Sequence, residues 1–423
     1  MADAGRATDT VVERPTAPAA GGSLHGGDDG ASSPPSRPPT RGDGHGPRHL
    51  ARRTDRPARD GRSERGGRAS RAQRRAARRA ARVAAGRPPR RGREVLRVGA
   101  AWVLVAPLAA WLAVRASGVG AGTWIETVIV LTPFAAAGSV AAMAVVAALR
   151  VRPALLAAAA TCVGFGLVVA PLFVPGPRPS SPPTGPTLRV MTVNVQFGLA
   201  DAERVVRLVR DREVAVLGVE ELTPAFDEAL REAGLDALLP YDHVEAVGGA
   251  EGTGLYSRYP VRPVDDGIAG RHRSPTALVA VPGAPPVQVS VVHPVPPVGD
   301  RSRGSWRATF RSLPRPGDEP LPVDGPAHPG DAEASERVHL LLGDFNATVD
   351  QPTMRALLDD GYVDAAGAVG RGWRMTWRFP HTPPLAIDHV LVDDATAVRS
   401  VEVHRVAGSD HRAVVATVRF PGA

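Results

Sequence analysis

The sequence predicts a mixed α/β domain that follows three membrane-spanning helices. Three observations indicate this: residues 98–174 contain three long apolar runs, residues 187–423 alternate short apolar segments with amphipathic ones, and charge is unevenly divided along the 423-residue chain. Residues 1–97 hold 23 arginines against 10 acidic residues, whereas residues 176–423 hold 25 arginines against 32 acidic residues. The formal net charge of +8 therefore comes from the N-terminal part, and the candidate catalytic part is acidic.

Residues 1–94 form an arginine-rich tail that we expect to be disordered. The tail is rich in Pro, Gly, Ser, Asp and Arg and has no sustained apolar period, so it offers little apolar surface for a core. Within it, Arg71–Arg82 alternates pairs of arginine with alanine and is compatible with a basic helix on an anionic membrane surface. The interpretation we prefer is a solvated tail whose charge sets the membrane orientation.

Three uncharged apolar runs within residues 95–175 are long enough to cross a bilayer. They are residues 98–114, 127–149 and 154–174, and each falls within the roughly 17 to 25 residues that a spanning helix needs. Buried helices of a soluble protein are the alternative, but three such runs in succession favour a membrane.

Arginines predict the sidedness of these helices. The tail flanks the first run, and Arg150 and Arg152 fill the short turn between the second and third runs, on the same side. Because basic loops stay in the cytoplasm, we predict a cytoplasmic N-terminus and an extracellular catalytic domain. Cys162, the only cysteine, lies in the third run, which excludes cysteine nucleophiles and thiolate metal sites from the outer part.

The outer part begins with a Pro-rich spacer, residues 176–186, that we expect to hold the domain off the membrane. Residues 187–423 have the length of one large domain. The pattern predicts strands at 188–195, 214–219, 254–257, 276–281, 287–292, 338–342, 386–392, 401–404 and 413–418. It predicts helices at 201–212, 224–233, 306–313 and 351–360, and a long surface loop at 314–336.

Polar side chains collect where these apolar segments begin or end. The clearest case is the strand that stops at Gly343, because Asp344 and Asn346 follow it on the same side. Taken alone, Gly-Asp-Phe-Asn is equally typical of a turn. The other segment ends carry Asn194, Glu220, Glu221, His293, Asp388, His389, Asp410 and His411. These residue types are the materials of an oxygen-ligand metal site with general acid and base groups.

The order of the motifs resembles that of the endonuclease/exonuclease/phosphatase superfamily over Leu188–Phe420. The resemblance is carried by Asn194, Glu221 in Val-Glu-Glu-Leu, Gly254–Pro260, His293, Gly343–Thr348, Thr376–Trp377, Ile387–His389 and Gly408–His411. It implies a four-layer α/β sandwich of two packed β-sheets flanked by helices, and hydrolysis of a phosphate ester with Mg²⁺ or Mn²⁺ as cofactor. Gln196 is a departure, because some nuclease members carry Asp there, and it weakens the case for a second metal ion.

The resemblance implies a metal-binding role for three residues. Glu221 is the main ligand, with Asn194 beside it and Asp410 as a further ligand. Glu220, the neighbour of Glu221, should point to the opposite face of its strand, and His389 is taken as structural.

The resemblance implies a catalytic role for five residues. Asp344 and Asn346 would position the attacking water and the phosphoryl oxygens. His411, oriented by Asp388, would act on the nucleophile or stabilise developing charge. His293 would bind the phosphate or protonate the leaving group.

The family spans several phosphate esters, so the fold leaves the substrate open. A nuclease should present a basic face to its polyanion, whereas this domain is acidic. Three spans also confine the site near the outer leaflet, so we prefer a phosphate ester or pyrophosphate of a membrane lipid or of a cell-wall lipid carrier. The alternatives are a cell-surface nuclease, with nucleic acid as a less favoured partner, and a non-catalytic membrane adaptor. The architecture is also similar to membrane-anchored actinobacterial members associated with resistance to the glycopeptides teicoplanin and vancomycin.

Overall fold

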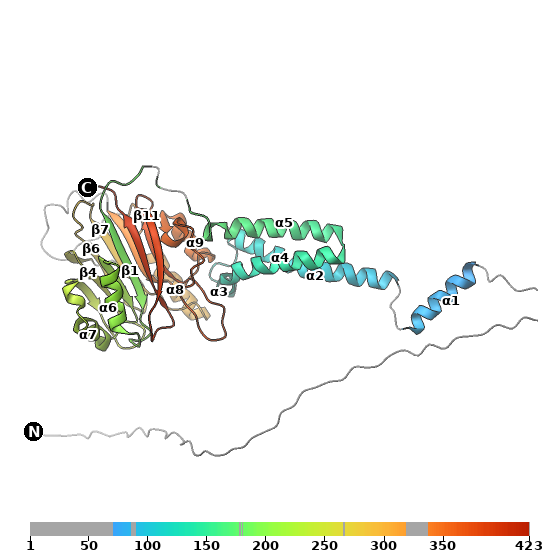
Figure 1. Cartoon of the computed structure of the whole chain (residues 1–423), viewed down its shortest axis with the longest axis horizontal. Helices are drawn as coiled ribbons and strands as arrows, with labels where there is room; N and C mark the ends of the chain where they lie inside the picture. Colours follow the sequence, from blue (N-terminus) through green and yellow to red (C-terminus); the bar gives the residue numbers. More distant parts are fainter. Residues whose placement is uncertain are drawn as a thin grey trace, which may run out of the picture. The chain divides into compact units, whose positions relative to one another are not determined.

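Two six-stranded β-sheets pack against each other in the domain that follows the apolar helices, with further helices on the outer faces of the sheets (Figure 1). The computed structural model describes residues 71–85, 90–176, 179, 181–264, 267–318 and 337–422. The order of layers is helices, sheet, sheet, helices, which confirms the predicted four-layer α/β sandwich.

Each sheet has one parallel pair of strands near its centre. The first sheet has the order β11 (Ala397–Arg405), β12 (Arg412–Arg419), β1 (Thr187–Asn194), β2 (Val216–Glu220), β4 (Thr253–Ser257), β3 (Tyr241–Glu245). The second has the order β5 (Val261–Val264), β6 (Thr276–Val279), β7 (Val287–Val292), β8 (Val338–Asp344), β10 (Asp388–Asp393), β9 (Tyr362–Asp364). The pairs β1–β2 and β7–β8 are parallel. Parallel neighbours need a crossover, which α6 (Ala202–Asp211) and α8 (Asp300–Ser312) supply.

The main hydrophobic core lies between the sheets, and a smaller core lies outside each of them. Val190 and Leu340 face the core between the sheets. Their neighbours Met191 and Leu341 point the opposite way, because side chains alternate along a strand, and pack toward α6 and α7 (Pro224–Glu232) or toward α8 and α9 (Pro352–Asp359). Both faces of the central strands are buried, so these strands read in the sequence as continuous apolar runs.

Several short elements were not predicted, namely β3, β5, β9, η3 (Leu235–Ala237) and α10 (Ala365–Ala368). The three strands lie at sheet edges or are only three to five residues long, so they leave too short a period in the sequence. Helix α8 also begins earlier than predicted, at Asp300, where the Ser302 hydroxyl accepts a hydrogen bond from the Gly299 amide (2.9 Å). Of the loop predicted at 314–336, residues 319–336 lie outside the described part of the chain.

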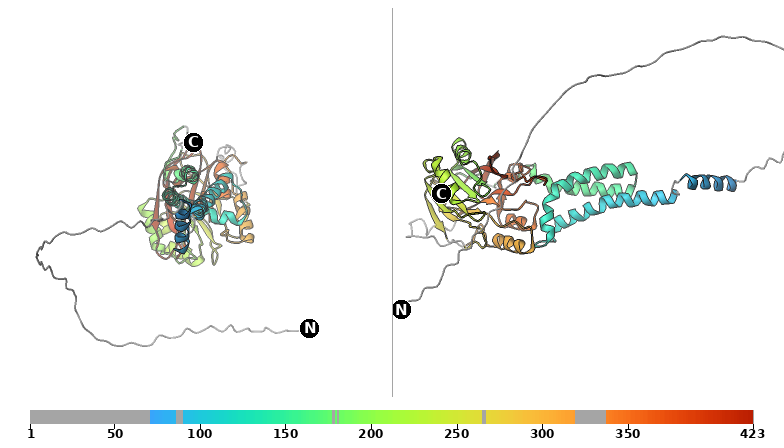
Figure 2. Two further views of the ribbon diagram at one scale, coloured as in Figure 1. Left: turned by 90° about the vertical axis from the view of Figure 1, so that its right-hand side faces the viewer. Right: turned by 90° about the horizontal axis from the view of Figure 1, so that it is seen from below.

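Three helices that are long and apolar enough to cross a membrane precede the domain. They are α2 (Arg90–Ser117), the run of α3 (Trp124–Val128), η1 (Ile129–Leu131) and α4 (Thr132–Leu149), and α5 (Arg152–Val169) with η2 (Ala170–Leu172). Helices α2, α4 and α5 lie side by side (Figure 1, Figure 2) and share a small apolar core. Two of these helices are longer than the uncharged runs. Helix α2 includes arginines at both ends, and the second helical run already begins at Trp124. We call this group of helices the bundle.

The tail is helical where the structure describes it. Helix α1 (Arg71–Ala84) is exposed along its whole length, and α2 already begins at Arg90, so the prediction of disorder is wrong for residues 71–84 and 90–94. Alanine and arginine are strong helix formers, which explains a helix without burial. Residues 1–70 lie outside the described residues.

The end of the predicted spacer belongs to the domain. The Gly185 amide donates to the Phe420 carbonyl, and the Phe420 amide donates to the Pro186 carbonyl, each at 3.0 Å. The domain is also in direct contact with the bundle, since Arg115 of α2 pairs with Asp350 after β8 (2.8 Å). The expectation that the spacer holds the domain off the membrane stays a prediction.

Strands β7 and β8 lie so close at Gly343 that the backbone leaves no room for a side chain there. The φ of Gly343 is 150°, and a Cβ at this position would lie 1.9 Å from the Val292 carbonyl oxygen. We expect Gly343→Ala to force the strands apart and lower the free energy of unfolding by about 1–3 kcal/mol, measured on the full chain in detergent. Gly248→Ala is the matched control, because no heavy atom lies within 4 Å of a Cβ there. Equal losses in the two variants would contradict the prediction.

Candidate active site

The strand ends bring all eight predicted site residues to one edge of the two sheets. Parallel strands end on the same side, so the β1–β2 and β7–β8 pairs deliver their carboxyl ends there. The antiparallel strands β10 and β12 begin at the same edge. The residues gathered in this way are Asn194, Glu221, His293, Asp344, Asn346, Asp388, Asp410 and His411.

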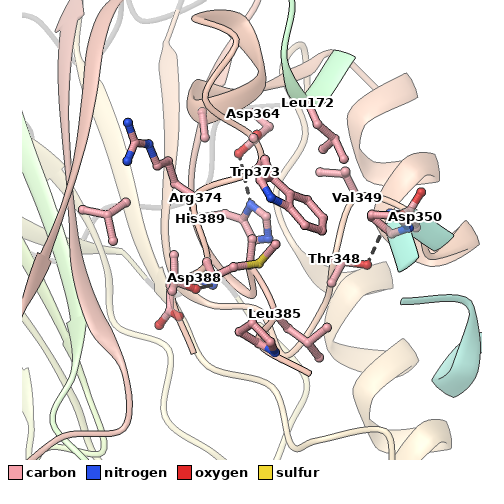
Figure 3. Close-up of a pocket in the computed structure, with 18 of the residues that line it drawn as sticks. Leu172, Thr348, Val349, Asp350, Asp364, Trp373, Arg374, Leu385, Asp388 and His389 are labelled. Atoms are coloured by element: carbon pink, nitrogen blue, oxygen red, sulfur yellow. Dashed lines mark hydrogen bonds and ion pairs between the residues drawn. The ribbon is translucent and has the colours of Figure 1, made fainter. Parts of the chain in front are cut away.

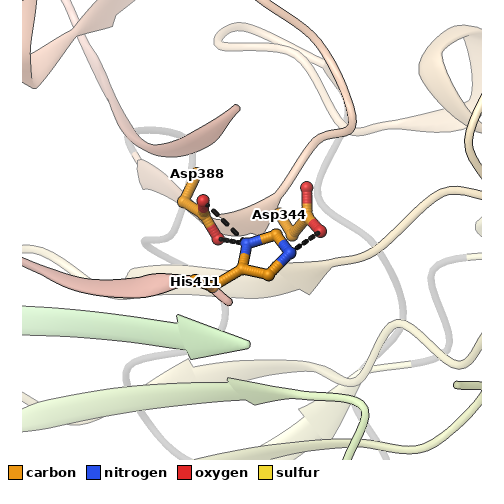
Figure 4. Close-up of side chains that lie close together, drawn as sticks. All are labelled: Asp344, Asp388 and His411. Atoms are coloured by element: carbon orange, nitrogen blue, oxygen red, sulfur yellow. Dashed lines mark hydrogen bonds and ion pairs between the residues drawn. The ribbon is translucent and has the colours of Figure 1, made fainter. Parts of the chain in front are cut away.

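Asp344, Asp388 and His411 form a buried cluster at the bottom of the site (Figure 4). His411 Nδ1 lies 3.0 Å from both carboxylate oxygens of Asp388, and its Nε2 lies 3.6 Å from Asp344 Oδ2. One ligand atom from each of the three residues lies within 4.8 Å of the others, close enough for all three to reach one metal ion. The sequence interpretation assigned these residues to catalysis and placed the metal on their neighbours.

Asn194 connects this cluster to Glu221. Its Nδ2 donates to Glu221 Oε1 (3.0 Å) and to Asp344 Oδ2 (3.1 Å), while its Oδ1 accepts from the backbone amide of Gln196 (2.9 Å). The second oxygen of Glu221 accepts from the Phe197 amide (2.9 Å). In this orientation Asn194 is a donor that holds two carboxylates together, and its Oδ1 would have to turn to become a metal ligand.

Four residues at this edge have backbone conformations that are rare outside glycine. The φ angles of Gln196, Phe197, Glu221 and Asn346 lie between 48° and 57°. Each such residue costs on the order of 1 kcal/mol or more and persists where the surroundings hold it. These turns aim side chains at the end of a strand into the space between the sheets.

Asp410 is fixed from two sides. Its amide donates to Gln196 Oε1 (2.9 Å), and its Oδ2 accepts from the indole of Trp377 (3.0 Å). Gln196, which departs from the nuclease pattern, therefore acts here by positioning Asp410. Trp377 was left out of the predicted site, and its place beside Asp410 could be found only from the fold.

His293 faces the cluster from the end of β7. Its Nε2 lies 3.8 Å from Asp344 Oδ2 and 3.9 Å from Glu221 Oε1. Behind it lies His272, which the sequence does not single out as a site residue; the two rings are 4.5 Å apart, and His272 Nδ1 lies 2.9 Å from the His293 carbonyl. Asn346 ties the loop together, because its Nδ2 donates to the Pro294 carbonyl (3.0 Å).

The two remaining sequence candidates lie away from the pocket. Glu220 is fully buried and accepts a hydrogen bond from Thr192 (2.6 Å). His389 is buried between Asp364 Oδ1 (3.0 Å) and the Ala347 carbonyl (2.9 Å). Neither lines the pocket that is lined by six of the eight site residues, namely Glu221, His293, Asp344, Asn346, Asp410 and His411.

Burial controls the electrostatics of the site. It raises the pKa of Glu221 and of Asp344, because loss of solvent penalises the charged carboxylate, and Asp388 raises the pKa of Asp344 further. Burial would lower the pKa of His411, but the charges of Asp388 and Asp344 outweigh it and raise that pKa to about 10. Burial and the neighbouring histidines lower the pKa of His293 well below its ordinary value. At neutral pH, His411 is an imidazolium and His293 is neutral.

The donor set fits a hard divalent cation. Glu221, Asp344 and Asp410 offer carboxylate oxygens around one pocket, and there is no sulfur ligand among the described residues near them. The raised pKa values of Glu221 and Asp344 reflect buried negative charge that a cation would stabilise. A hard divalent cation suits these oxygens, and Asn194 Oδ1, once turned toward it, would complete the set.

The pair of His411 and Asp388 should make stability depend on pH when metal is removed. The pKa of His411 rises from 6.5 to about 10 on folding, so its stabilising effect is complete below pH 6.5 and is lost as pH rises toward 10. We expect the Tm of the EDTA-treated chain to fall from pH 7 to pH 10, and to fall less in Asp388→Asn. Parallel curves for the two proteins would show that the ion pair has no such role.

Comparisons with known proteins agree with this geometry. The sequence model described as "Endonuclease/Exonuclease/phosphatase family" matches residues 191–411. No curated protein matches the chain. Similar solved structures include an endonuclease/exonuclease/phosphatase protein from Beutenbergia cavernae (21% identity, 56% of this chain and 72% of that chain, TM-score 0.37). Others are a 3′ phosphatase from Neisseria bound to a product DNA hairpin (20%, 54% and 98%, TM-score 0.40) and an AP endonuclease from Archaeoglobus fulgidus (13%, 54% and 98%, TM-score 0.40).

The family model spans the strands, the turns and the buried Asp/His cluster described above. It covers more than half of the chain, and the protein therefore belongs to the endonuclease/exonuclease/phosphatase family, as a phosphoesterase with an acidic and histidine-containing site.

Proposed function

We propose that this phosphoesterase is membrane-anchored, depends on Mg²⁺ or Mn²⁺, and hydrolyses a phosphate ester or pyrophosphate of a membrane lipid outside the cytoplasm. The observation that carries the proposal is the composition of the catalytic pocket, whose volume is about 470 Å³. Thr127 and Val130 of the bundle form part of its wall, beside Glu221 and His411. None of the described residues that line it is an arginine. An amphiphilic phosphate ester fits such a pocket better than a polyanion does.

The rim of the pocket supports a lipid substrate in the same way. Phe197, Val298 and Phe379 line the pocket and are 52%, 77% and 51% exposed. Exposed apolar side chains around a polar site are typical of surfaces that bind apolar groups or membranes. A nuclease would instead be expected to contact phosphates with arginine along such a rim.

The cation would be held by Glu221, Asp344 and Asp410, with Asn194 as a further ligand. When bound, Mg²⁺ or Mn²⁺ supplies Lewis-acid stabilisation of the phosphoryl oxygens and offsets the buried negative charge.

The described side chains suggest how the reaction proceeds. Asp344 has a raised pKa, so its carboxylate is suited to accept a proton from an attacking water. His411, held as an imidazolium by Asp388, would donate from Nε2 to the charge that develops on the phosphoryl group. His293 is neutral, so it is better suited to donate one hydrogen bond to the phosphate than to protonate a leaving group. Asn346 holds the turn that carries Asp344, since the backbone amide of Asn346 donates to Asp344 Oδ1 (2.9 Å).

Two other interpretations, a role in glycopeptide resistance and a non-catalytic adaptor, have less support. The likeness to glycopeptide-resistance members rests on the sequence alone, and neither the family match nor the solved structures support it. A non-catalytic adaptor would not need to hold a full set of acidic, amide and histidine side chains around one pocket, which argues against that alternative.

Catalysis is tested by neutral substitutions in the pocket. We expect Asp344→Asn and His411→Asn to lower kcat by about 100-fold or more, because proton transfer and charge stabilisation are removed. The assay measures phosphate release by the full chain from a prenyl pyrophosphate and a long-chain alkyl phosphate with Mg²⁺, and EDTA should abolish it.

Asp360→Asn and His404→Asn are matched controls, because these residues make only surface ion pairs, with Arg315 and Glu402. Cleavage of plasmid DNA without release of phosphate from either lipid would overturn the lipid proposal in favour of a nuclease. Full activity in both pocket variants would favour the adaptor.

The membrane orientation is a separate proposal. Arg91, Arg93 and Arg97 lie at the start of α2, and Arg150 and Arg152 lie at the α4–α5 turn, away from the domain (Figure 1). The positive charge at that end predicts that it is cytoplasmic and that the domain is extracellular. A reporter enzyme fused after Ala423 should be active only outside the cytoplasm, and activity inside would remove the argument for an extracellular substrate.

A further inference from the structure

An apolar crevice lies next to the catalytic pocket, between the bundle and the domain (Figure 3). Its volume is about 40 Å³, room for about three water-sized groups. Most of the side chains that line it are apolar. The bundle contributes Val130, Pro133, Phe134 and Leu172, and the domain contributes Val349, Trp373, Met375 and Leu385.

The crevice and the catalytic pocket share two wall residues. Val130 from η1 and Leu385 from the loop before β10 line both spaces. A group that leaves the catalytic pocket past Val130 therefore meets Pro133 and Phe134 of α4, which continue the same apolar surface. The polar end of a ligand would lie among the carboxylates and histidines, and its apolar end along the bundle.

Three of the polar side chains that line the crevice, those of Asp350, Asp364 and Thr376, are engaged with other partners. Asp364 is hydrogen-bonded to His389, and Asp350 is paired with Arg115 (2.8 Å). Thr376 Oγ1 accepts hydrogen bonds from the Ile387 and Asp388 amides (3.0 and 3.1 Å). These groups are satisfied without a ligand, so the crevice behaves as an apolar surface.

Buried polar contacts hold the bundle in place beside the pocket. Glu126 is fully buried, and its two oxygens accept from the Gly122 amide (2.7 Å) and the Thr353 amide (3.0 Å). Arg115 and Asp350 are almost buried as well, and Thr127 Oγ1 donates to the Pro297 carbonyl (2.8 Å). A buried charge without partners is costly, so these paired groups specify one arrangement of η1 against the loops that follow β7 and β8.

Aromatic side chains surround the outer end of the crevice. Trp373 packs against Phe134 of α4 and Phe173 after η2, with ring centroids 5.6 and 6.0 Å away. Tryptophan gathers at the boundary between lipid and water, so this end of the crevice has the character of the membrane interface.

From this continuity we infer that the crevice binds the first few carbons of the substrate's hydrocarbon chain, with the rest of the chain running on along the bundle, which makes the bundle a specificity-determining part of the enzyme. The inference rests on the proposed lipid phosphoesterase activity. The occupant is the linear alkyl or prenyl chain of a phosphate ester whose phosphate lies among Glu221, Asp344 and His411. The first carbons of that chain pass between Val130 and Leu385.

The test compares esters that differ only in chain length. The full chain in detergent is given hexadecyl and butyl phosphate, and the corresponding diphosphates, and kcat/KM is measured for each. We expect Val130→Trp, which places bulk at the junction, to lower the hexadecyl-to-butyl ratio of kcat/KM at least tenfold. Leu385→Trp, which narrows the same passage from the domain, should lower the ratio in the same way. The second variant keeps the test valid if the first does not fold.

Val140→Trp is the matched control, because Val140 is an exposed valine of α4 away from the crevice, and the ratio should stay as in the unaltered chain. An unchanged ratio in both junction variants, with the long-chain ester still hydrolysed, would overturn the crevice inference and leave the proposed function intact. If the unaltered chain hydrolyses neither long-chain ester, the proposed function fails, and the inference fails with it.

Discussion

The site depends on the parallel pairing of two strands in each sheet. A parallel pair needs a helical crossover, and it places two carboxyl ends side by side at one edge. Here the β1–β2 and β7–β8 pairs face each other across the central core, so residues at the ends of four strands meet. The hydrogen bond from Asn194 to Asp344 joins the two sheets at this point. Gly343, which permits the close approach of β7 and β8, is part of the same constraint.

Burial then sets the chemistry. Three carboxylates and two histidines are removed from water within a small volume, and burial penalises the charge of each of them. The neighbouring side chains stabilise the charge of some of these groups and not of others. Asp388 and Asp344 keep His411 charged, whereas His293 loses its charge next to His272 and His411. The two histidines thus differ in charge, because burial and the neighbouring histidines lower the pKa of His293, whereas the carboxylates around His411 outweigh its burial. The excess negative charge that remains is what a divalent cation would balance.

The helices before the domain do more than lengthen the chain. Arg115, Glu126 and Thr127 each make a polar contact with a loop that carries or adjoins the site. Through these contacts η1 becomes a wall of the catalytic pocket. A pocket with carboxylates at its base and an apolar helix at its side distinguishes the two ends of an amphiphilic molecule, which is the physical basis for the proposed lipid substrate.

The sequence by itself determined the three apolar helices and most of the longer strands, and it singled out eight polar residues that the fold brings to one edge of the sheets. These features are local, since an apolar run of a given length, or a strand followed by Gly-Asp-Phe-Asn, can be read from neighbouring residues. The short edge strands β3, β5 and β9 escaped prediction because their stability comes from pairing with distant strands. At residues 71–84 the alternation of arginine and alanine allowed a basic helix while the overall composition favoured a solvated tail, and the structure is helical there. Only the tertiary structure decided that Asn194 lies beside Asp344, that Gln196 positions Asp410, and that Val130 faces both the pocket and the crevice. Contacts between residues far apart in the chain leave no period in the sequence, so they appear only when packing brings the segments together.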